Sequence, residues 1–181
     1  YPNPLEQGLV AGANPSGALV GCIAYGMLSE KSGRVSTIKV SSGIWILGSF
    51  ISIFVLNIWM VILSRLIKGV SVGIFSALLP VYIGEVIPKK RKGTATSTIQ
   101  LALTAAILLM FYVCFFMNFI GNHLSFRISW GLEMIPALLL FFLAFLLPES
   151  PRWLVTHGKY TDAQEILERL KSTKFGKGVS K

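Results

Sequence analysis

The stretch between Arg65 and Gly93 reads RLIKGVSVGIFSALLPVYIGEVIPKKRKG. It is apolar over most of its length and ends in a run of basic residues at 89–92. A hydrocarbon core about 30 Å thick requires roughly 20 apolar residues in one helix. Residues 62–87 satisfy that requirement, and the basic run after them is typical of a helix end in water. This stretch therefore predicts a membrane-spanning helix.

The composition of the whole chain agrees with a membrane protein. The 181 residues are 53% hydrophobic and only 14% charged, and the mean hydropathy is +0.66. A soluble domain carries roughly 25% charged residues, so an ordinary soluble enzyme is excluded. The high apolar content also excludes a disordered chain. The two cysteines, Cys22 and Cys114, both lie in apolar runs and do not form a disulfide framework.

Similar apolar segments lie on both sides of the opening stretch. Lipid-exposed segments must be helical, because their backbone groups have to bond to one another. The first segment is rich in small residues, and Gly17 and Gly21 lie four apart on one helical face, as do Gly8 and Gly12. That spacing allows a neighbouring helix to approach closely. We predict five spans, at about 8–28, 42–60, 62–87, 94–117 and 128–147.

The formal net charge of +9 indicates membrane topology rather than nucleic-acid binding. A nucleic-acid-binding protein gathers its basic residues on one face, whereas here they lie in separate clusters between apolar segments. Basic residues accumulate in the cytoplasmic loops of membrane proteins. We therefore expect an extracellular N-terminus and a cytosolic C-terminus, with cytosolic connections at 29–40, 88–93 and 148–181.

The tail at 155–181 has a different pattern from the spans. Thr161 and Gln164 have the spacing of a capping box. Apolar residues then recur at helical spacing opposite charged ones, beginning with Ala163. We predict an amphipathic cytosolic helix over 161–173 that lies against protein or lipid headgroups.

Enzyme chemistry has little support. His123 and His157 are expected at opposite membrane surfaces, and no cluster of side chains has metal-ligand spacing. The serines lack a nearby base. We therefore expect no catalytic residues, no metal and no cofactor.

Charged residues inside apolar segments are the first candidates for function, because burying a charge in lipid is costly. Arg65, Glu85 and Glu133 lie within the predicted spans, with Lys68 as a fourth candidate. Each has a structural alternative. Arg65 and Lys68 can extend to water at the outer surface, Glu133 can face the same water, and Glu85 can pair with the basic run that follows it.

Three motifs occur along the chain in a recognisable order. The first is the opening stretch, the second is GMLSEKSGRV from Gly26 to Val35, and the third is PESPRWL from Pro148 to Leu154. Together they resemble the sugar porters, the sugar-transporter branch of the major facilitator superfamily. The positions of the opening stretch that match the family are Arg65, Gly69, Gly73, Pro80, Tyr82, Glu85, Pro88, Lys92 and Gly93.

The resemblance covers essentially the whole chain, as helices two to six of a twelve-helix protein similar to fungal hexose transporters. It implies an all-α polytopic protein of the plasma membrane with a partial major facilitator superfamily fold. It also implies transport of a hexose or related sugar by alternating access, with the proton as a candidate co-transported ion. A polyol or inositol carrier and a non-transporting nutrient sensor are the alternatives. Because the family's other helices are absent, the chain is interpreted as a truncated fragment.

The substrate contact that the resemblance implies is Gln100, which matches a glutamine on the family's fifth helix. The helix is expected to begin near Gly93, so a rise of about 1.5 Å per residue puts Gln100 roughly 10 Å deep. Carriers of this kind build their sites near the midplane, and an amide offers both donors and an acceptor to hydroxyl groups. Thr104 shares the same helical face. The alternative for Gln100 is a hydrogen bond between helices.

The resemblance assigns further roles. Arg65 matches an arginine that pairs with an acidic residue of the family's first helix, which makes it a candidate for proton coupling. Glu133 stands where the family leads us to expect glutamine. Gly69 and Gly73 make a close-packing face, like Gly17 and Gly21. A cytosolic rim of gating ion pairs is expected from Glu30, Lys31, Arg34, Glu85, Lys92, Glu149 and Arg152, for which the alternative is a role in topology alone.

Overall fold

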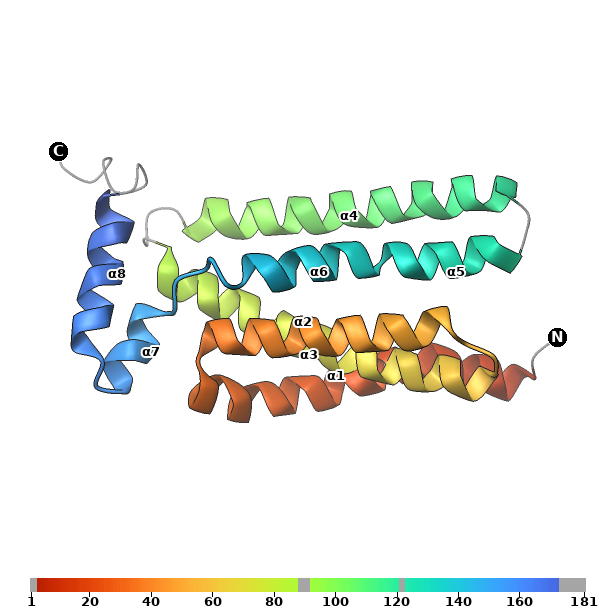
Figure 1. Cartoon of the computed structure of the whole chain (residues 1–181), viewed down its shortest axis with the longest axis horizontal. Helices are drawn as coiled ribbons and strands as arrows, with labels where there is room; N and C mark the ends of the chain where they lie inside the picture. Colours follow the sequence, from red (N-terminus) through yellow and green to blue (C-terminus); the bar gives the residue numbers. More distant parts are fainter. Residues whose placement is uncertain (1–2, 88–91, 121–122, 173–181) are drawn as a thin grey trace.

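The computed structural model describes residues 3–87, 92–120 and 123–172. These residues form helices and no strand, which confirms the all-α fold. Helices α1 to α6 run lengthwise in an elongated bundle, and α8 lies across one end of it beside α7 (Figure 1). The helices are α1 (Pro4–Ser32), α2 (Arg34–Ile53), α3 (Ile58–Val86), α4 (Lys92–Ile120), α5 (His123–Leu132), α6 (Met134–Leu143), α7 (Pro151–Thr156) and α8 (Tyr160–Ser172).

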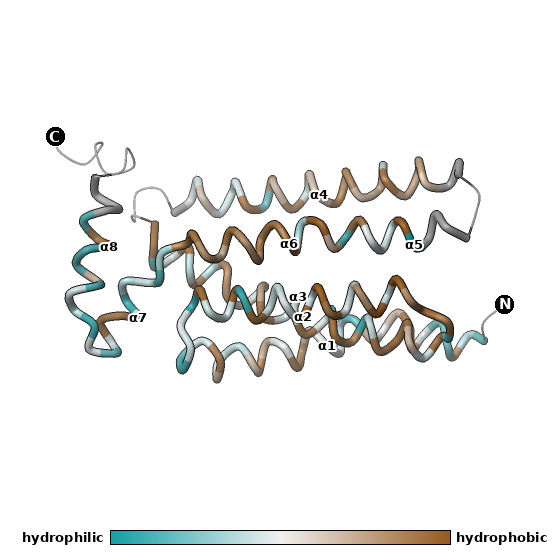
Figure 2. The backbone as a smooth tube through the Cα atoms, viewed as in Figure 1, coloured by the Kyte–Doolittle hydropathy of each residue, from teal (hydrophilic) through white to brown (hydrophobic). Residues whose placement is uncertain are grey.

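Three of the described helices are long and apolar enough to cross a membrane. They are α2, α3 and the part of α4 from Gly93 to Met117. Large apolar side chains of α4 and α6, such as Phe111 and Phe142, are exposed, and Figure 2 shows apolar residues along both helices. Such a surface suits lipid contact. The expected spans at 8–28 and 128–147 stay predictions, because α1 is less apolar and α5 and α6 are short.

The connection between the first two helices is much shorter than the expected loop at 29–40. Helix α1 continues to Ser32 and α2 begins at Arg34, so only Gly33 separates them. Gly33 has a φ of 85°, a left-handed conformation that favours glycine. The prediction was wrong here because charged residues near helix ends read as a loop. The turn between α2 and α3 also lies earlier than the gap between the predicted spans at 42–60 and 62–87, since α2 ends at Ile53 and α3 begins at Ile58.

The predicted last span is divided at Glu133, between α5 and α6. Pro136 has no N–H and cannot donate to the carbonyl of Leu132, so one helical hydrogen bond is missing at this point. The backbone of Glu133 remains helical, with φ −60° and ψ −23°. The chain thus continues in a helical direction with one hydrogen bond missing. The side chain of Glu133 lies at this point, between two short helices.

Helices α1 and α3 pack closely through small residues. Gly17, Gly21, Gly69 and Gly73 are all buried. A Cβ atom at any of them would collide with the backbone carbonyl of a residue on the opposite helix. A Cβ at Gly12, in contrast, would meet nothing within 4 Å. The interface between α1 and α3 therefore tolerates no side chain at these four positions.

Helix α2 packs on the other side of α3 through buried hydroxyl groups. Ser41 Oγ lies 3.1 Å from the Ser71 carbonyl, and Ser71 Oγ donates to the Ser41 carbonyl at 2.8 Å. Gly48, further along α2, lies against the side chain of Lys68. These contacts fix α2 relative to the charged residues of α3.

Two helices follow the bundle: α7 begins in the PESPRWL motif, and α8 lies in the tail. Ser150 caps α7 by accepting a hydrogen bond from the N–H of Trp153 at 3.4 Å, and Pro151 occupies the first turn. The amphipathic helix expected at 161–173 is α8, with Ala163 buried. The capping box at Thr161 was wrong, because α8 begins one residue earlier and Thr161 lies within its first turn.

Candidate functional site: a charged network and a cavity with an ion pair

A network of charged and polar groups joins three segments at the end of the bundle that carries α7. The guanidinium of Arg34 donates to Glu85 through Nε and Nη2, each at 3.1 Å. Ser150 Oγ donates to Glu85 Oε2 at 2.5 Å. The side chains of Arg34 and Glu85 are only 16% and 7% exposed. The pair is therefore bidentate and mostly removed from water, unlike a surface ion pair.

Glu149 completes the network by binding the backbone at the start of α2. Its carboxylate accepts from the N–H groups of Arg34 at 2.7 Å and Val35 at 3.0 Å. These are free N-terminal donors of α2, where a negative charge is also favourable for the helix dipole. A Cβ at Gly33 would lie 2.8 Å from Glu149 Oε2, so glycine also makes room for this carboxylate.

Two further hydrogen bonds attach α7 to the bundle. Trp153 Nε1 donates to the carbonyl of Glu30 at 3.0 Å, and the Tyr82 hydroxyl donates to the carbonyl of Pro148 at 2.8 Å. The three motifs found in the sequence are therefore in contact in the fold, at 30–35, 82–85 and 148–153.

The structure brings some of the predicted rim residues together and leaves others apart. Arg34, Glu85 and Glu149 form the network, in which Glu85 pairs with Arg34. The basic run, the alternative partner of Glu85, lies outside the residues whose side chains the structure describes. The side chains of Glu30, Lys31 and Arg152 are exposed. The side chain of Lys92 lies outside the described residues.

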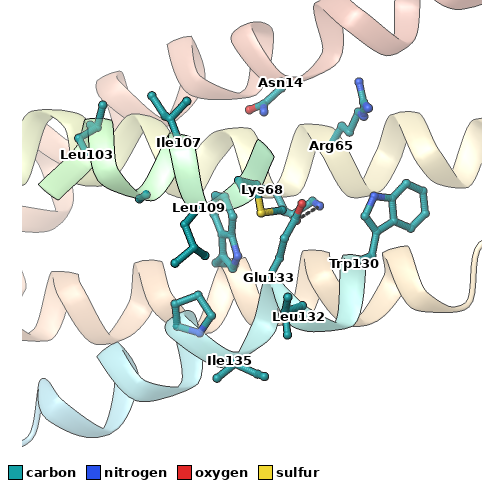
Figure 3. Close-up of a pocket in the computed structure, with 14 residues that line it drawn as sticks. Asn14, Arg65, Lys68, Leu103, Ile107, Leu109, Trp130, Leu132, Glu133 and Ile135 are labelled. Atoms are coloured by element: carbon teal, nitrogen blue, oxygen red, sulfur yellow. Dashed lines mark hydrogen bonds and ion pairs between the residues drawn. The ribbon is translucent and has the colours of Figure 1, made fainter. Parts of the chain in front are cut away.

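A cavity of about 900 Å³ lies between α1, α2, α3, α4 and the α5–α6 pair. Figure 3 shows its charged residues on α3 and at the α5–α6 break, where Lys68 and Glu133 point toward one another, and apolar side chains on α4. Its polar and aromatic lining consists of Asn14, Trp45, Arg65, Lys68, Trp130 and Glu133.

An ion pair lies inside this cavity. Lys68 Nζ is 2.9 Å from Glu133 Oε2, and the Lys68 side chain is 9% exposed. Lys68 therefore does not extend to surface water, so that alternative was wrong. This pairing was not predicted from the sequence, although the predicted topology places both charges near the outer ends of spans that run in opposite directions.

Arg65 lies one helical turn before Lys68 and also lines the cavity. Its Nη1 donates to the carbonyl of Val10 on α1 at 3.1 Å. Arg65 is half-buried and faces into the bundle, so this cation is held by a backbone dipole.

Gln100 and Thr104 are exposed on α4 and do not line the cavity. The Thr104 hydroxyl donates to the Gln100 carbonyl at 2.9 Å within the same helix. Leu103 and Ile107 do line the cavity, and they share a helical face with Gln100. Gln100 therefore lies one turn beyond the lining residues of α4, on the same face.

Apolar helices around a cavity that contains an ion pair, with a buried charged network at one end, are the arrangement found in membrane transporters. The sugar (and other) transporter family matches residues 3–180, and the chain belongs to that family.

Relatives and solved structures agree with this membership. The chain is 38% identical over 170 residues to a probable metabolite transport protein of Saccharomyces cerevisiae, covering 94% of this chain and 32% of that protein. It is 37% identical to high-affinity glucose transporter 1 of Candida albicans, covering 92% of this chain and 30% of that protein. The proton:xylose symporter XylE has a TM-score of 0.86 at 26% identity, with 96% of this chain and 41% of XylE covered. The chain thus spans about a third of the length of these curated relatives.

Proposed function

We propose that this chain forms part of a transporter that moves a hexose or a related sugar across the plasma membrane by alternating access. The observation that carries the proposal is the buried network of Arg34, Glu85 and Glu149, at one end of a bundle whose cavity contains an ion pair. Family membership supports it, as does the relative whose name describes a glucose transporter.

The network suits a gate at the cytosolic side. It joins the α1–α2 connection, the end of α3 and the start of α7, so a relative movement of these segments must break hydrogen bonds that involve charges. Making these bonds favours one conformation, and their loss permits the other. Glu30, Lys31, Lys92 and Arg152 are proposed to contribute at the same surface, toward parts of the complete transporter.

Orientation follows from the distribution of basic residues. We place the C-terminus and the charged network in the cytosol and the N-terminus of this chain outside, because Lys and Arg are concentrated on that side. The bilayer is the partner of the exposed apolar surfaces of α4 and α6.

Proton coupling is proposed through Arg65. One structural neighbour is described as a proton:xylose symporter. Arg65 lines the cavity as a cation bonded to a backbone carbonyl, so it can interact with a carboxylate that enters the cavity. Such an opposite charge keeps a carboxylate ionised until a conformational change separates the two.

Gln100→Ala tests the proposed substrate contact. In the natural full-length gene product, we expect the variant to weaken sugar binding about ten-fold or more, because a ligand hydroxyl loses a hydrogen-bonding partner. The measurement is isothermal titration calorimetry, in which D-glucose is added to the purified protein in nanodiscs.

Thr98→Ala is the matched control. Thr98 lies on the opposite face of α4 from Gln100, and its hydroxyl donates to the Thr94 carbonyl. The affinity of the Thr98→Ala variant for D-glucose is expected to stay within two-fold of the natural value. If Gln100→Ala leaves affinity within two-fold and lowers thermal stability, the glutamine joins helices and does not bind sugar.

A further inference from the structure

The carboxylate of Glu133 is held on one side only. Oε2 accepts from Lys68 Nζ at 2.9 Å, and the described residues place no hydrogen-bond donor on Oε1. The Glu133 side chain is 24% exposed, against 9% for Lys68. In Figure 3 it extends from the α5–α6 break toward α3, among the residues that line the cavity. The open side of the carboxylate therefore belongs to the cavity.

The side chain of Lys68 is confined by its neighbours, and this fixes the position of its ammonium group beside Glu133. A Cβ at Gly48 would lie 2.6 Å from Lys68 Cγ, so the lysine stem crosses α2 where a glycine leaves room for it. The ammonium group also lies 5.8 Å from the centre of the Trp130 ring. With its stem confined, Lys68 determines where the Glu133 carboxylate lies.

The groups around Glu133 suit a neutral, hydroxyl-rich ligand. The Lys68–Glu133 pair has no net charge, so a neutral ligand leaves no ion uncompensated. An ionised carboxylate only accepts hydrogen bonds, and bonds to a charged acceptor are stronger than neutral ones. Asn14 adds an amide, and Trp45 and Trp130 add flat apolar surfaces that can cover the C–H groups of a sugar ring.

We propose that Glu133 binds the sugar directly, accepting hydrogen bonds from ligand hydroxyls, and that Lys68 is its positioning residue. This deepens the proposed function and rests on it. It adds a contact on the α5–α6 side of the cavity to the one proposed for Gln100 on α4.

Exchanging the charges of Lys68 and Glu133 distinguishes a carboxylate that binds the sugar from an ion pair that only stabilises the fold. The double variant Lys68→Glu with Glu133→Lys retains an ion pair between α3 and the α5–α6 break, but it moves the carboxylate to α3. If Glu133 contacts the sugar, the exchange should keep the melting temperature near that of the natural protein while D-glucose affinity falls about ten-fold or more. Glu133→Gln, which is nearly isosteric, should lose a similar factor even if the exchange does not fold.

The experiment uses the natural full-length gene product in nanodiscs, titrated with D-glucose, D-xylose and myo-inositol. Lys39→Met is the matched control, since Lys39 is a partly buried lysine that lies over Phe145, away from the cavity. Natural affinity in the exchange variant, or in Glu133→Gln, would overturn the proposal for Glu133 alone. If the unaltered protein bound none of the three ligands, the proposed function would fail, and this inference with it.

Discussion

Gly73→Leu should greatly reduce the yield of folded protein. A Cβ at Gly73 would collide with the backbone of Ala18 on α1, and backbone cannot move aside as a flexible side chain can. Overpacking a core usually costs about 1–3 kcal/mol, and we expect a cost at or above that range here because two helices must separate. The total stability of a protein is only about 5–15 kcal/mol. The measurement is the fraction of protein that elutes as a single species after extraction in mild detergent.

Gly12→Leu is the control for this result. Gly12 lies on the same helix as Ala18, and an added Cβ there meets nothing within 4 Å. A leucine at this position also has a better helix propensity than glycine. We expect normal yield and elution. Equal yields for the two variants would contradict the close α1–α3 packing.

Glu85→Ala should cost about 3–5 kcal/mol, the usual loss when one partner of a buried ion pair is removed. The variant leaves the Arg34 guanidinium, only 16% exposed, without its bidentate acceptor. It also removes the acceptor of the Ser150 hydroxyl. The measurement is thermal unfolding of the natural full-length gene product. Arg34→Ala and the double variant complete a cycle that isolates the coupling between the two side chains.

Arg152→Ala provides the comparison for Glu85→Ala. Arg152 belongs to the same sequence motif as Ser150 but its side chain is exposed, so its loss should change stability by less than about 0.5 kcal/mol. If both variants unfold at the same temperature, the network does not stabilise this end of the bundle.

The packing of α1 on α3 was largely predictable from the sequence. Glycines four residues apart lie on one helical face, and such a face in lipid implies a close neighbour. The sequence did not distinguish Gly17 and Gly21 from Gly8 and Gly12, which have the same spacing. The difference arises because Gly17 lies five residues after Gly12, about 140° further round the helix. The two pairs therefore occupy different faces of α1, and only the face of Gly17 and Gly21 packs on α3.

The charged network was predictable in its membership but not in its pairing. Motif resemblance assigned Arg34, Glu85 and Glu149 to one rim. It did not show that Glu149 caps α2 through two backbone N–H groups, because that contact requires Gly33 to be the whole connection between α1 and α2. The length of that connection depends on tertiary contacts that override the loop-like sequence.

The cavity was the least predictable part. Lys68 and Glu133 were each noted as charges inside spans, yet each was given an alternative that exposed it to water. Their contact depends on a gap at Gly48 and on the break before Pro136, and both are properties of packing rather than of local pattern. The assignment of Gln100 and Thr104 as substrate contacts remains a prediction, since both lie outside the cavity lining.

The central claim, that this chain belongs to a working sugar transporter, is tested most directly by uptake of labelled D-glucose into liposomes that contain the natural full-length gene product. We predict uptake that saturates with concentration, is inhibited by excess unlabelled sugar, and falls strongly in Gln100→Ala. Uptake of D-glucose, D-xylose and myo-inositol no faster than into protein-free liposomes, from protein shown to be folded, would contradict the account.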